Sequence, residues 1–213
     1  CEYACTKTSD TDLPDADFVD ANCDGIDGDV DDAIFVSSTG KNSADGTLED
    51  PVATIAKGMS LQVVEGKSAV YVAAGVYAEQ VVVSNGVRIY GGFSADGLWE
   101  RNFYVHETII AWDTLDEDLA VRAVIFKDIK DPAVLDGVTI QAGANPKNGG
   151  SSYGVWFHTS SSEARLSYSR VIAGNGGSGV AGSDGLPGVD GLSGANGKLT
   201  NTTDCNCNEF ESY

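Results

Sequence analysis

Short apolar runs separated by turn residues dominate the pattern of this chain. Four of them are four or five residues long and rich in β-branched residues, at Ala33–Val36, Ala69–Ala73, Gln80–Val83 and Val87–Tyr90. Runs of this kind are typical of β-strands. The connections Gly75–Tyr77 and Ser84–Gly86 are short enough for hairpins, so this region alone leaves the pairing direction open.

One stretch has a helical period instead. From Val52 onwards, apolar residues recur every three or four positions, at Ile55, Ala56, Met59 and Val63. This spacing predicts one amphipathic helix. Its apolar stripe must be buried on something, and an end of the β-structure is the natural partner.

Two stretches of the chain repeat each other at an offset of 31 residues. Residues 123–143 align without a gap on residues 154–174, and six positions are identical, including Phe126/Phe157 and Leu135/Leu166. A unit that returns to the same side-chain positions predicts one turn of a β-solenoid, in which each coil stacks on the next. The residues between the units, Ala144–Tyr153, are then a loop. The alternative is a coincidental similarity of two β-hairpins.

Several segments also carry a resemblance to a known family. They are Ile34–Ser37 with Asp45-Gly46-Thr47 and Pro51–Ile55, Tyr71–Glu79, and Val87–Phe93 with Trp99-Glu100-Arg101. They resemble secreted right-handed parallel β-helix proteins of the pectin-lyase-like type. With the leader Asp20–Gly28, the chain looks like myxobacterial-type surface lipoproteins. The resemblance covers residues 13–175 and implies the fold, but it implies no particular activity, because such helices host lyases, hydrolases and structural adhesins alike.

The leader contains a candidate calcium loop between Asp20 and Asp31. Oxygen side chains occupy positions 1, 3, 5 and 12 of this loop, and Gly25 stands at position 6, where a calcium loop turns sharply. We expect Ca²⁺ to be bound by Asp20, Asn22, Asp24, Ile26 through its carbonyl, Asp29 and Asp31. The alternative is an acidic, solvated linker.

Charge and cysteine content restrict the functions further. The net charge of −19 excludes nucleic acid as a partner, because the lysine and arginine clusters that bind phosphates are absent. Cys1 is a candidate lipid anchor, as left by signal-peptide cleavage of a bacterial lipoprotein, and a trimmed chain end is the alternative. Disulfide candidates are Cys5, Cys23, Cys205 and Cys207; Cys205 and Cys207 are too close in sequence to bridge each other without strain.

Glycine recurs at every third position from Gly176 to Gly197. One interpretation is a collagen-like triple helix, but Pro187 is the only proline in the run. We favour a polyproline-II-type strand that packs through its glycine face. A flexible linker is the third interpretation.

The sequence contains no convincing catalytic set. Weak candidates on the repeated units are Asp128 and Asp131, with Arg165 and Arg170 one coil later; acids beside Pro132 are common in turns for structural reasons. A second hypothesis is an aromatic platform for sugar rings. It would be formed by Trp99, Trp112 and Trp156 with Tyr90, Tyr104 and Tyr153. We favour a core role for these rings.

Together these observations predict an all-β fold, a right-handed parallel β-helix with one N-terminal capping helix. We expect an Asp-rich leader over residues 1–32, the β-helix over 33–175, the glycine triplets over 176–198 and a cysteine-containing tail over 199–213. The expected function is a secreted or surface-anchored structural or binding protein of the bacterial envelope or matrix, stabilised by Ca²⁺ and without catalysis. Polysaccharide or a surface protein is the expected partner, and the membrane is reached only through Cys1. The alternatives are a lyase or hydrolase acting on acidic polysaccharide and a self-assembling fibre subunit.

Overall fold

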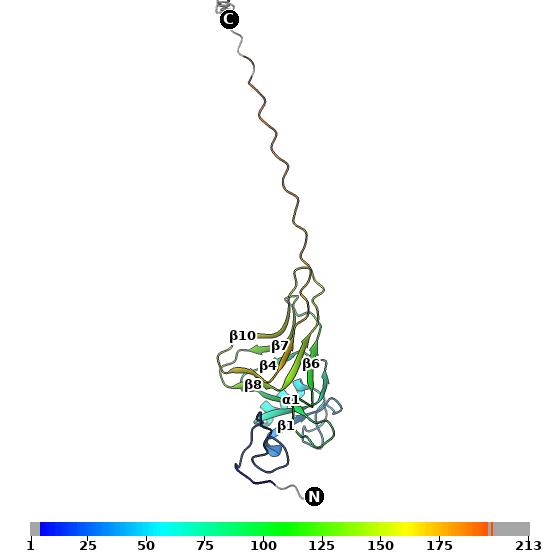
Figure 1. Cartoon of the computed structure of the whole chain (residues 1–213), viewed down its shortest axis with the longest axis vertical. Coiled ribbons are helices and arrows are strands. Elements are labelled where there is room, and N and C mark those ends of the chain that lie inside the picture. Colours follow the sequence, from blue (N-terminus) through cyan, green and yellow to red (C-terminus); the bar gives the residue numbers. More distant parts are fainter. Residues whose placement is uncertain (1–4, 196, 198–213) are drawn as a thin grey trace, which may run out of the picture. The chain divides into compact units, whose positions relative to one another are not determined.

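The structure is a computed structural model that describes residues 5–195 and 197. The chain divides into two units, residues 1–180 and 181–213, and each is taken by itself. All strands and helices of the described chain lie in the first unit (Figure 1).

Three sheets form the first unit, and every strand pair within them is parallel. The first sheet contains β1 (Ala33–Val36), β2 (Ala69–Ala73), β5 (Arg88–Phe93), β8 (Ala133–Asp136) and β11 (Ala164–Ser167). The second contains β3 (Gly75–Tyr77), β6 (Thr108–Trp112), β9 (Val138–Ala142) and β12 (Arg170–Ile172). The third contains β4 (Val81–Val83), β7 (Val121–Lys127) and β10 (Ser152–His158).

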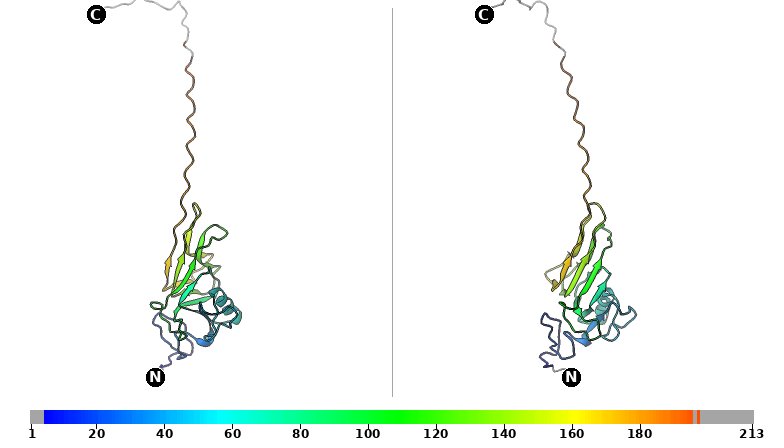
Figure 2. Two further views of the ribbon diagram at one scale, coloured as in Figure 1. Left: turned by 90° about the vertical axis from the view of Figure 1, so that its right-hand side faces the viewer. Right: turned by 45° about the vertical axis from the view of Figure 1, so that its right-hand side comes forward.

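The chain visits these sheets in repeated rounds. After β2 it passes through β3 and β4, then through β5, β6 and β7, and then through β8, β9 and β10. Strands of successive rounds therefore lie side by side and run in the same direction (Figure 2). Hairpins would have produced antiparallel ladders, so the order of strands defines a parallel, β-helix-like fold.

The register confirms the repeat that the sequence predicted. Val124 pairs with Val155, Leu135 with Leu166, and Ile140 with Val171, each across 31 residues. Two boundaries were wrong. Gly75–Tyr77 is a strand and not a connection, and Ser152 and Tyr153 belong to β10 and not to the loop.

Two cores cover the two faces of the first sheet. One is aliphatic and lies among the three sheets; its members include Ile34, Val70 and Ile89. The other is largely aromatic and includes Phe35, Tyr71, Phe93 and Trp99 together with Ile26 of the leader. Because both faces of this sheet are buried, the sequences of β1 and β2 are continuous apolar runs and do not alternate between apolar and polar residues.

The single α-helix of the described chain, α1 (Ile55–Glu65), packs against β1 and β2. The side chain of Thr54 accepts a hydrogen bond from the Lys57 amide at its start, and Gly66 ends it in the left-handed conformation (φ 70°). The helix was predicted correctly, and its buried face in part: Ile55 is buried and Met59 packs against the aliphatic core, as predicted. Ile55, Gly58 and Gln62 are buried, whereas Ala56 is exposed and Val63 is 66% exposed.

Gly58 explains why the buried face of the helix is rotated away from the apolar stripe that the sequence predicted. A Cβ atom at Gly58 would lie 2.6 Å from Cγ2 of Val36 and 2.9 Å from Cγ1 of Val70. The helix backbone therefore sits directly on the strands at this position, and a larger residue would force it away. A count of apolar residues alone misses a contact that depends on the lack of a side chain.

The described part of the second unit, residues 181–195 and 197, contains no helix or strand. Apart from each glycine itself and the residues next to it in the chain, no atom lies within 4 Å of the place where a Cβ would stand on its glycines, Gly182 to Gly197. The packed-strand and triple-helix interpretations both need a second surface against this face, so they stay predictions. In the part of the chain that the structure describes, no helix has the length and apolar character that crossing a bilayer requires.

Candidate functional site

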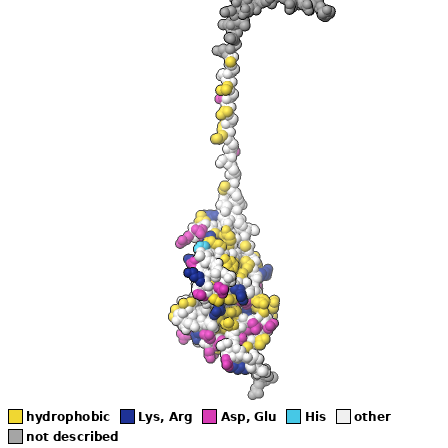
Figure 3. Space-filling view, turned by 90° about the vertical axis from the view of Figure 1, so that its left-hand side faces the viewer, with side chains coloured by type: hydrophobic (Ala, Val, Ile, Leu, Met, Phe, Trp, Pro, Cys, Tyr) yellow, Lys and Arg dark blue, Asp and Glu magenta, His cyan; other side chains and the backbone are white. Residues whose placement is uncertain are grey.

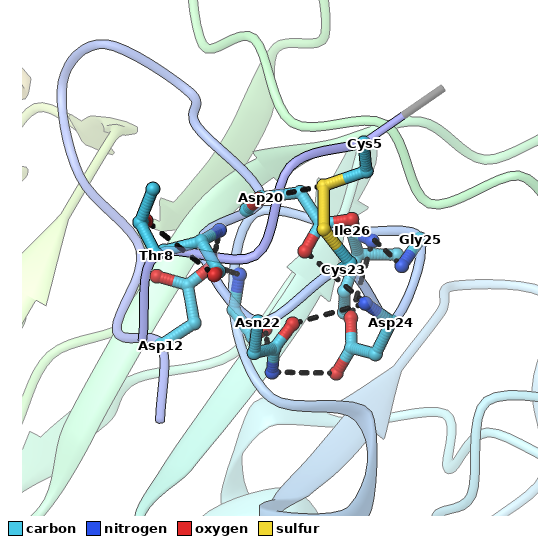
Figure 4. Close-up of a disulfide and its surroundings, with 11 residues drawn as sticks. Cys5, Thr8, Asp12, Asp20, Asn22, Cys23, Asp24, Gly25 and Ile26 are labelled. Carbon is cyan, nitrogen blue, oxygen red and sulfur yellow. Dashed lines mark hydrogen bonds between the residues drawn. A yellow bond between two sulfur atoms is a disulfide. The ribbon is translucent and has the colours of Figure 1, made fainter. Parts of the chain in front are cut away.

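The candidate calcium loop is folded around its own carboxylates (Figure 4). Asp20 accepts hydrogen bonds from the amides of Asp24 and Gly25, at 3.2 and 2.9 Å. Asp24 accepts from the amides of Ile26 and Val30, at 3.3 and 2.8 Å. The sharp turn falls at Gly25 (φ 108°), where the pattern placed it.

Hydrogen bonds within the loop join three of the six proposed ligands, Asp20, Asn22 and Asp24. The Asn22 side-chain oxygen accepts from the same Asp24 amide as Asp20, and its amide nitrogen donates to Asp24 Oδ2 at 2.9 Å. Asp29 instead caps the following 3₁₀ turn by accepting from the Asp31 amide. Within residues 5–195, no three His, Cys, Asp or Glu side chains are grouped to hold a metal ion.

The loop is fastened to the rest of the leader by a disulfide and a buried carboxylate. Cys5 and Cys23 are bonded to each other, with their Cα atoms 5.7 Å apart. Asp12 is buried and accepts from the amides of Ala21 and Gly28, at 3.0 and 3.1 Å. Cys1, Cys205 and Cys207 lie outside the described residues.

A buried arginine joins the leader to the sheets, and the sequence analysis did not single it out. The side chain of Arg101 is fully buried. It forms ion pairs with Asp27 at 3.1 Å and with Asp136 of β8, and it donates to the carbonyl oxygens of Asp15 and Gly91 at 2.5 and 3.1 Å. Four aromatic rings surround it with centroids 5.3–5.9 Å from Cζ, those of Phe18, Tyr90, Phe93 and Phe103.

This arrangement is structural in character. Arg101 has its charge neutralised by two carboxylates, and its fork of N–H groups is used to hold backbone and side chains from the leader, β5 and β8. Its only signal in the sequence was the Trp99-Glu100-Arg101 motif of the family resemblance. Asp27 lies within the candidate calcium loop, and its side chain pairs with Arg101.

Burial raises the pKa of the Asp27 carboxyl from 3.8 to about 6, even though Arg101 acts to lower it. Because the pKa is higher in the folded state, folding takes up a proton between these two values. The contribution of Asp27 to the free energy of unfolding is therefore full below about pH 4 and is lost as the pH rises to about 6. We expect the Asp27→Asn variant to lack this pH dependence, as measured by urea unfolding between pH 4 and 7.

Asp96 provides the control for this titration. Hydrogen bonds from the Ser94 hydroxyl and the Leu98 amide lower the pKa of Asp96. In a carbon-detected NMR titration, Asp27 should change charge well above Asp96. A titration of Asp27 at or below that of Asp96 would contradict the burial argument.

The weak catalytic candidates are not brought together. Asp128 and Asp131 lie on the exposed turn between β7 and β8, where Asp131 accepts from the side chain of Asn85 at 2.5 Å. Arg165 is on β11 and Arg170 on β12, in different sheets. Among the described residues, no ion pair or hydrogen bond joins either aspartate to either arginine.

The aromatic residues divide between core and surface. Trp99 and Tyr90 are buried in the aromatic core, as the core interpretation predicted. Trp112, Tyr153 and Trp156 are only partly covered or exposed, and Tyr153 and Trp156 stack with centroids 6.5 Å apart. Hydrophobic side chains lie among acidic and basic ones on the surface of the first unit (Figure 3).

A groove of about 600 Å³ collects part of this aromatic surface. Its floor is the outer face of the third sheet, where Val82, Ile125 and Trp156 stand in register on β4, β7 and β10. Its other lining residues are Gln80, Trp112, Leu115, Asp116, Glu117, Asp118, Arg122, Lys127 and His158. The Arg122 guanidinium lies 3.8 Å from the Trp156 ring centroid and pairs with Asp116 and Asp118.

Each full round of the chain adds one strand to each of three parallel sheets. Together with the docked leader and the lateral groove, this arrangement defines a β-helix-like protein. Comparison with protein families agrees: the sequence model of DUF1565, described as a protein of unknown function, matches residues 38–203, and this family is associated with β-helix-like proteins. The chain belongs to the DUF1565 family. Comparison with curated proteins gave no match, and neither did comparison with solved structures.

Proposed function

We propose that the protein is a secreted or surface-anchored structural or binding module of the bacterial envelope or matrix, built on a right-handed parallel β-helix. The observation that carries the proposal is the leader, which is closed by the Cys5–Cys23 disulfide and held by Arg101. Disulfides persist in oxidising compartments outside the cytosol. The sites in the described residues favour binding over catalysis, because the Arg101 ion network is buried and neither Asp128 nor Asp131 pairs with an arginine.

Surface labelling of cells that express the protein tests this role. We expect a membrane-impermeant biotin reagent to label the protein on intact cells, and Cys5 and Cys23 to resist alkylation until a reductant is added. The Cys1→Ser variant should leave the cell surface and appear in the medium. Protein that stays unlabelled until cells are lysed, with free thiols, would refute an extracellular location.

We further propose that Ca²⁺ binds the leader loop and stiffens it. The donor set suits a hard cation, because Asp20, Asn22 and Asp24 bring carboxylate and amide oxygens around one tight turn. These three residues would hold the ion, with the Ile26 carbonyl, Asp29 and Asp31 as the further ligands that the sequence pattern suggests. The disulfide beside the loop would limit the rearrangement that binding requires.

Calcium is expected to raise the melting temperature of the protein. Binding to the folded state alone stabilises it by about 2.7 kcal/mol when the ion is at 100 times its dissociation constant. The measurement is scanning calorimetry with 1 mM CaCl₂ and with a chelator, on the wild type and on Asp20→Asn/Asp24→Asn.

The double variant separates the ion from the hydrogen bonds. Both carboxylates also accept backbone amides, so the variant is expected to melt lower in chelator as well. Its calcium-induced shift, and not its absolute stability, is the test. Equal shifts in the two proteins, or no shift in the wild type, would show that the loop is not a calcium site.

A further inference from the structure

We propose that the groove on the outer face of the third sheet binds a neutral saccharide chain. This inference rests on the binding role proposed above and names its ligand. The site is the groove floored by Val82, Ile125 and Trp156 and walled by the segment that connects β6 to β7.

The floor has the shape and chemistry for a sugar ring. Val82, Ile125 and Trp156 belong to three neighbouring parallel strands, so their side chains form one continuous apolar row. Trp112 and Leu115 extend this apolar surface from the β6 side. A saccharide presents C–H groups on the faces of its rings and hydroxyls at the edges, which matches an apolar floor with polar walls. The Arg122 guanidinium covers one face of Trp156, so the apolar surface offered to the sugar also includes Val82, Ile125 and Trp112. The volume of about 600 Å³ is within the usual range for small-molecule sites.

Unpaired hydrogen-bond donors are concentrated at this groove. Three buried side-chain polar atoms in residues 5–195 have no partner, and two of them are N–H groups of residues that line it, Trp112 Nε1 and Arg122 Nε. A buried donor without a partner costs about 1–3 kcal/mol. A hydroxyl oxygen that reaches them after a small side-chain adjustment relieves that cost, and the carboxylates of Asp116 and Asp118 are acceptors for the hydroxyl hydrogens.

The charges of the groove favour a neutral chain over an acidic one. Three carboxylates, Asp116, Glu117 and Asp118, face two strong cations, Arg122 and Lys127. Arg122 is already paired with Asp116 and Asp118, and its guanidinium covers the Trp156 ring. A polyuronate would therefore meet three carboxylates with only Lys127 as a cation outside the ion pairs of the described chain, and the net charge of −19 would repel it. A neutral chain incurs neither penalty.

Isothermal titration calorimetry on the full chain tests the proposal. The probes are hexasaccharides of cellulose, xylan, laminarin and mannan as neutral chains, hexagalacturonate as the acidic chain and chitosan hexamer as the cationic one. We expect at least one neutral chain to bind, with an affinity reduced about tenfold in Trp156→Ala and several-fold in Trp112→Phe. Tyr104→Ala, which removes an exposed aromatic ring outside the groove, should bind as the wild type does.

Trp112→Phe keeps an aromatic ring at this position but removes the Nε1–H donor together with part of the indole. It is a milder change than Trp156→Ala, so it remains informative if Trp156→Ala does not fold. Binding of the acidic or cationic chain alone, neutral binding that survives both tryptophan substitutions, or no binding of any neutral chain overturns the inference. These outcomes leave the surface-labelling result untouched. A surface-located protein without saccharide binding would retain the proposed function and lose only this ligand.

Discussion

Replacing Arg101 by methionine is expected to lower the free energy of unfolding by about 3–5 kcal/mol, because it leaves two buried carboxylates without a counter-charge. Asp27 and Asp136 both pair with this guanidinium, and neither side chain is appreciably exposed. The substitution also frees the carbonyl oxygens of Asp15 and Gly91. Urea unfolding followed by tryptophan fluorescence measures the change.

Arg88→Met is the matched control for this variant. Arg88 lies on β5, is half-buried and forms no ion pair in the described chain, so we expect a change within about 0.5 kcal/mol. The triple variant Arg101→Met/Asp27→Leu/Asp136→Leu should recover much of the loss, because no buried charge remains unpaired. If Arg101→Met costs no more than Arg88→Met, the buried network does not hold the leader.

Replacing Phe126 by alanine is expected to cost about 3–5 kcal/mol, the usual range for a fully buried phenylalanine. Phe126 lies in the aliphatic core on β7, and its ring stacks on Phe157 of β10 with the centroids 4.7 Å apart. Thermal and urea unfolding of the variant measure the loss.

Phe157→Ala provides the comparison, because Phe157 holds the same position one round later. The Phe157 side chain is 48% exposed, so folding removes less of its apolar surface from water. Phe157→Ala should therefore lower the free energy of unfolding by less than half as much as Phe126→Ala. Equal costs for the two substitutions would mean that the last round is covered in solution, and a smaller cost at Phe126 would contradict the register.

The stacking of the rounds could be predicted from the sequence for a physical reason. When parallel strands pair without a shift in register, a position in one round contacts the equivalent position in the next. The two positions then have the same packing environment, which favours the same side chain. Phe126 with Phe157 and Leu135 with Leu166 are identical pairs that the structure places in register. The pattern could not reveal β3, since Gly75, Val76 and Tyr77 do not form a recognisable apolar run.

The Arg101 network could not be predicted, because its partners are far apart in the sequence. Asp27 precedes Arg101 by 74 positions and Asp136 follows it by 35. Each of these residues looks like an ordinary surface charge in its local sequence. The calcium loop is the opposite case: its pattern is local, and the structure does bring Asp20, Asn22 and Asp24 together around one turn.

The same network sets an order of assembly during synthesis. The leader precedes every strand in the chain, and Cys5 and Cys23 are separated by only 18 positions. Its docking site, however, is incomplete until β8 has supplied Asp136. The leader therefore docks only after β8 has been made, although it precedes all three sheets in the chain, and until then Asp27 and Arg101 remain in water, where neither charge is penalised.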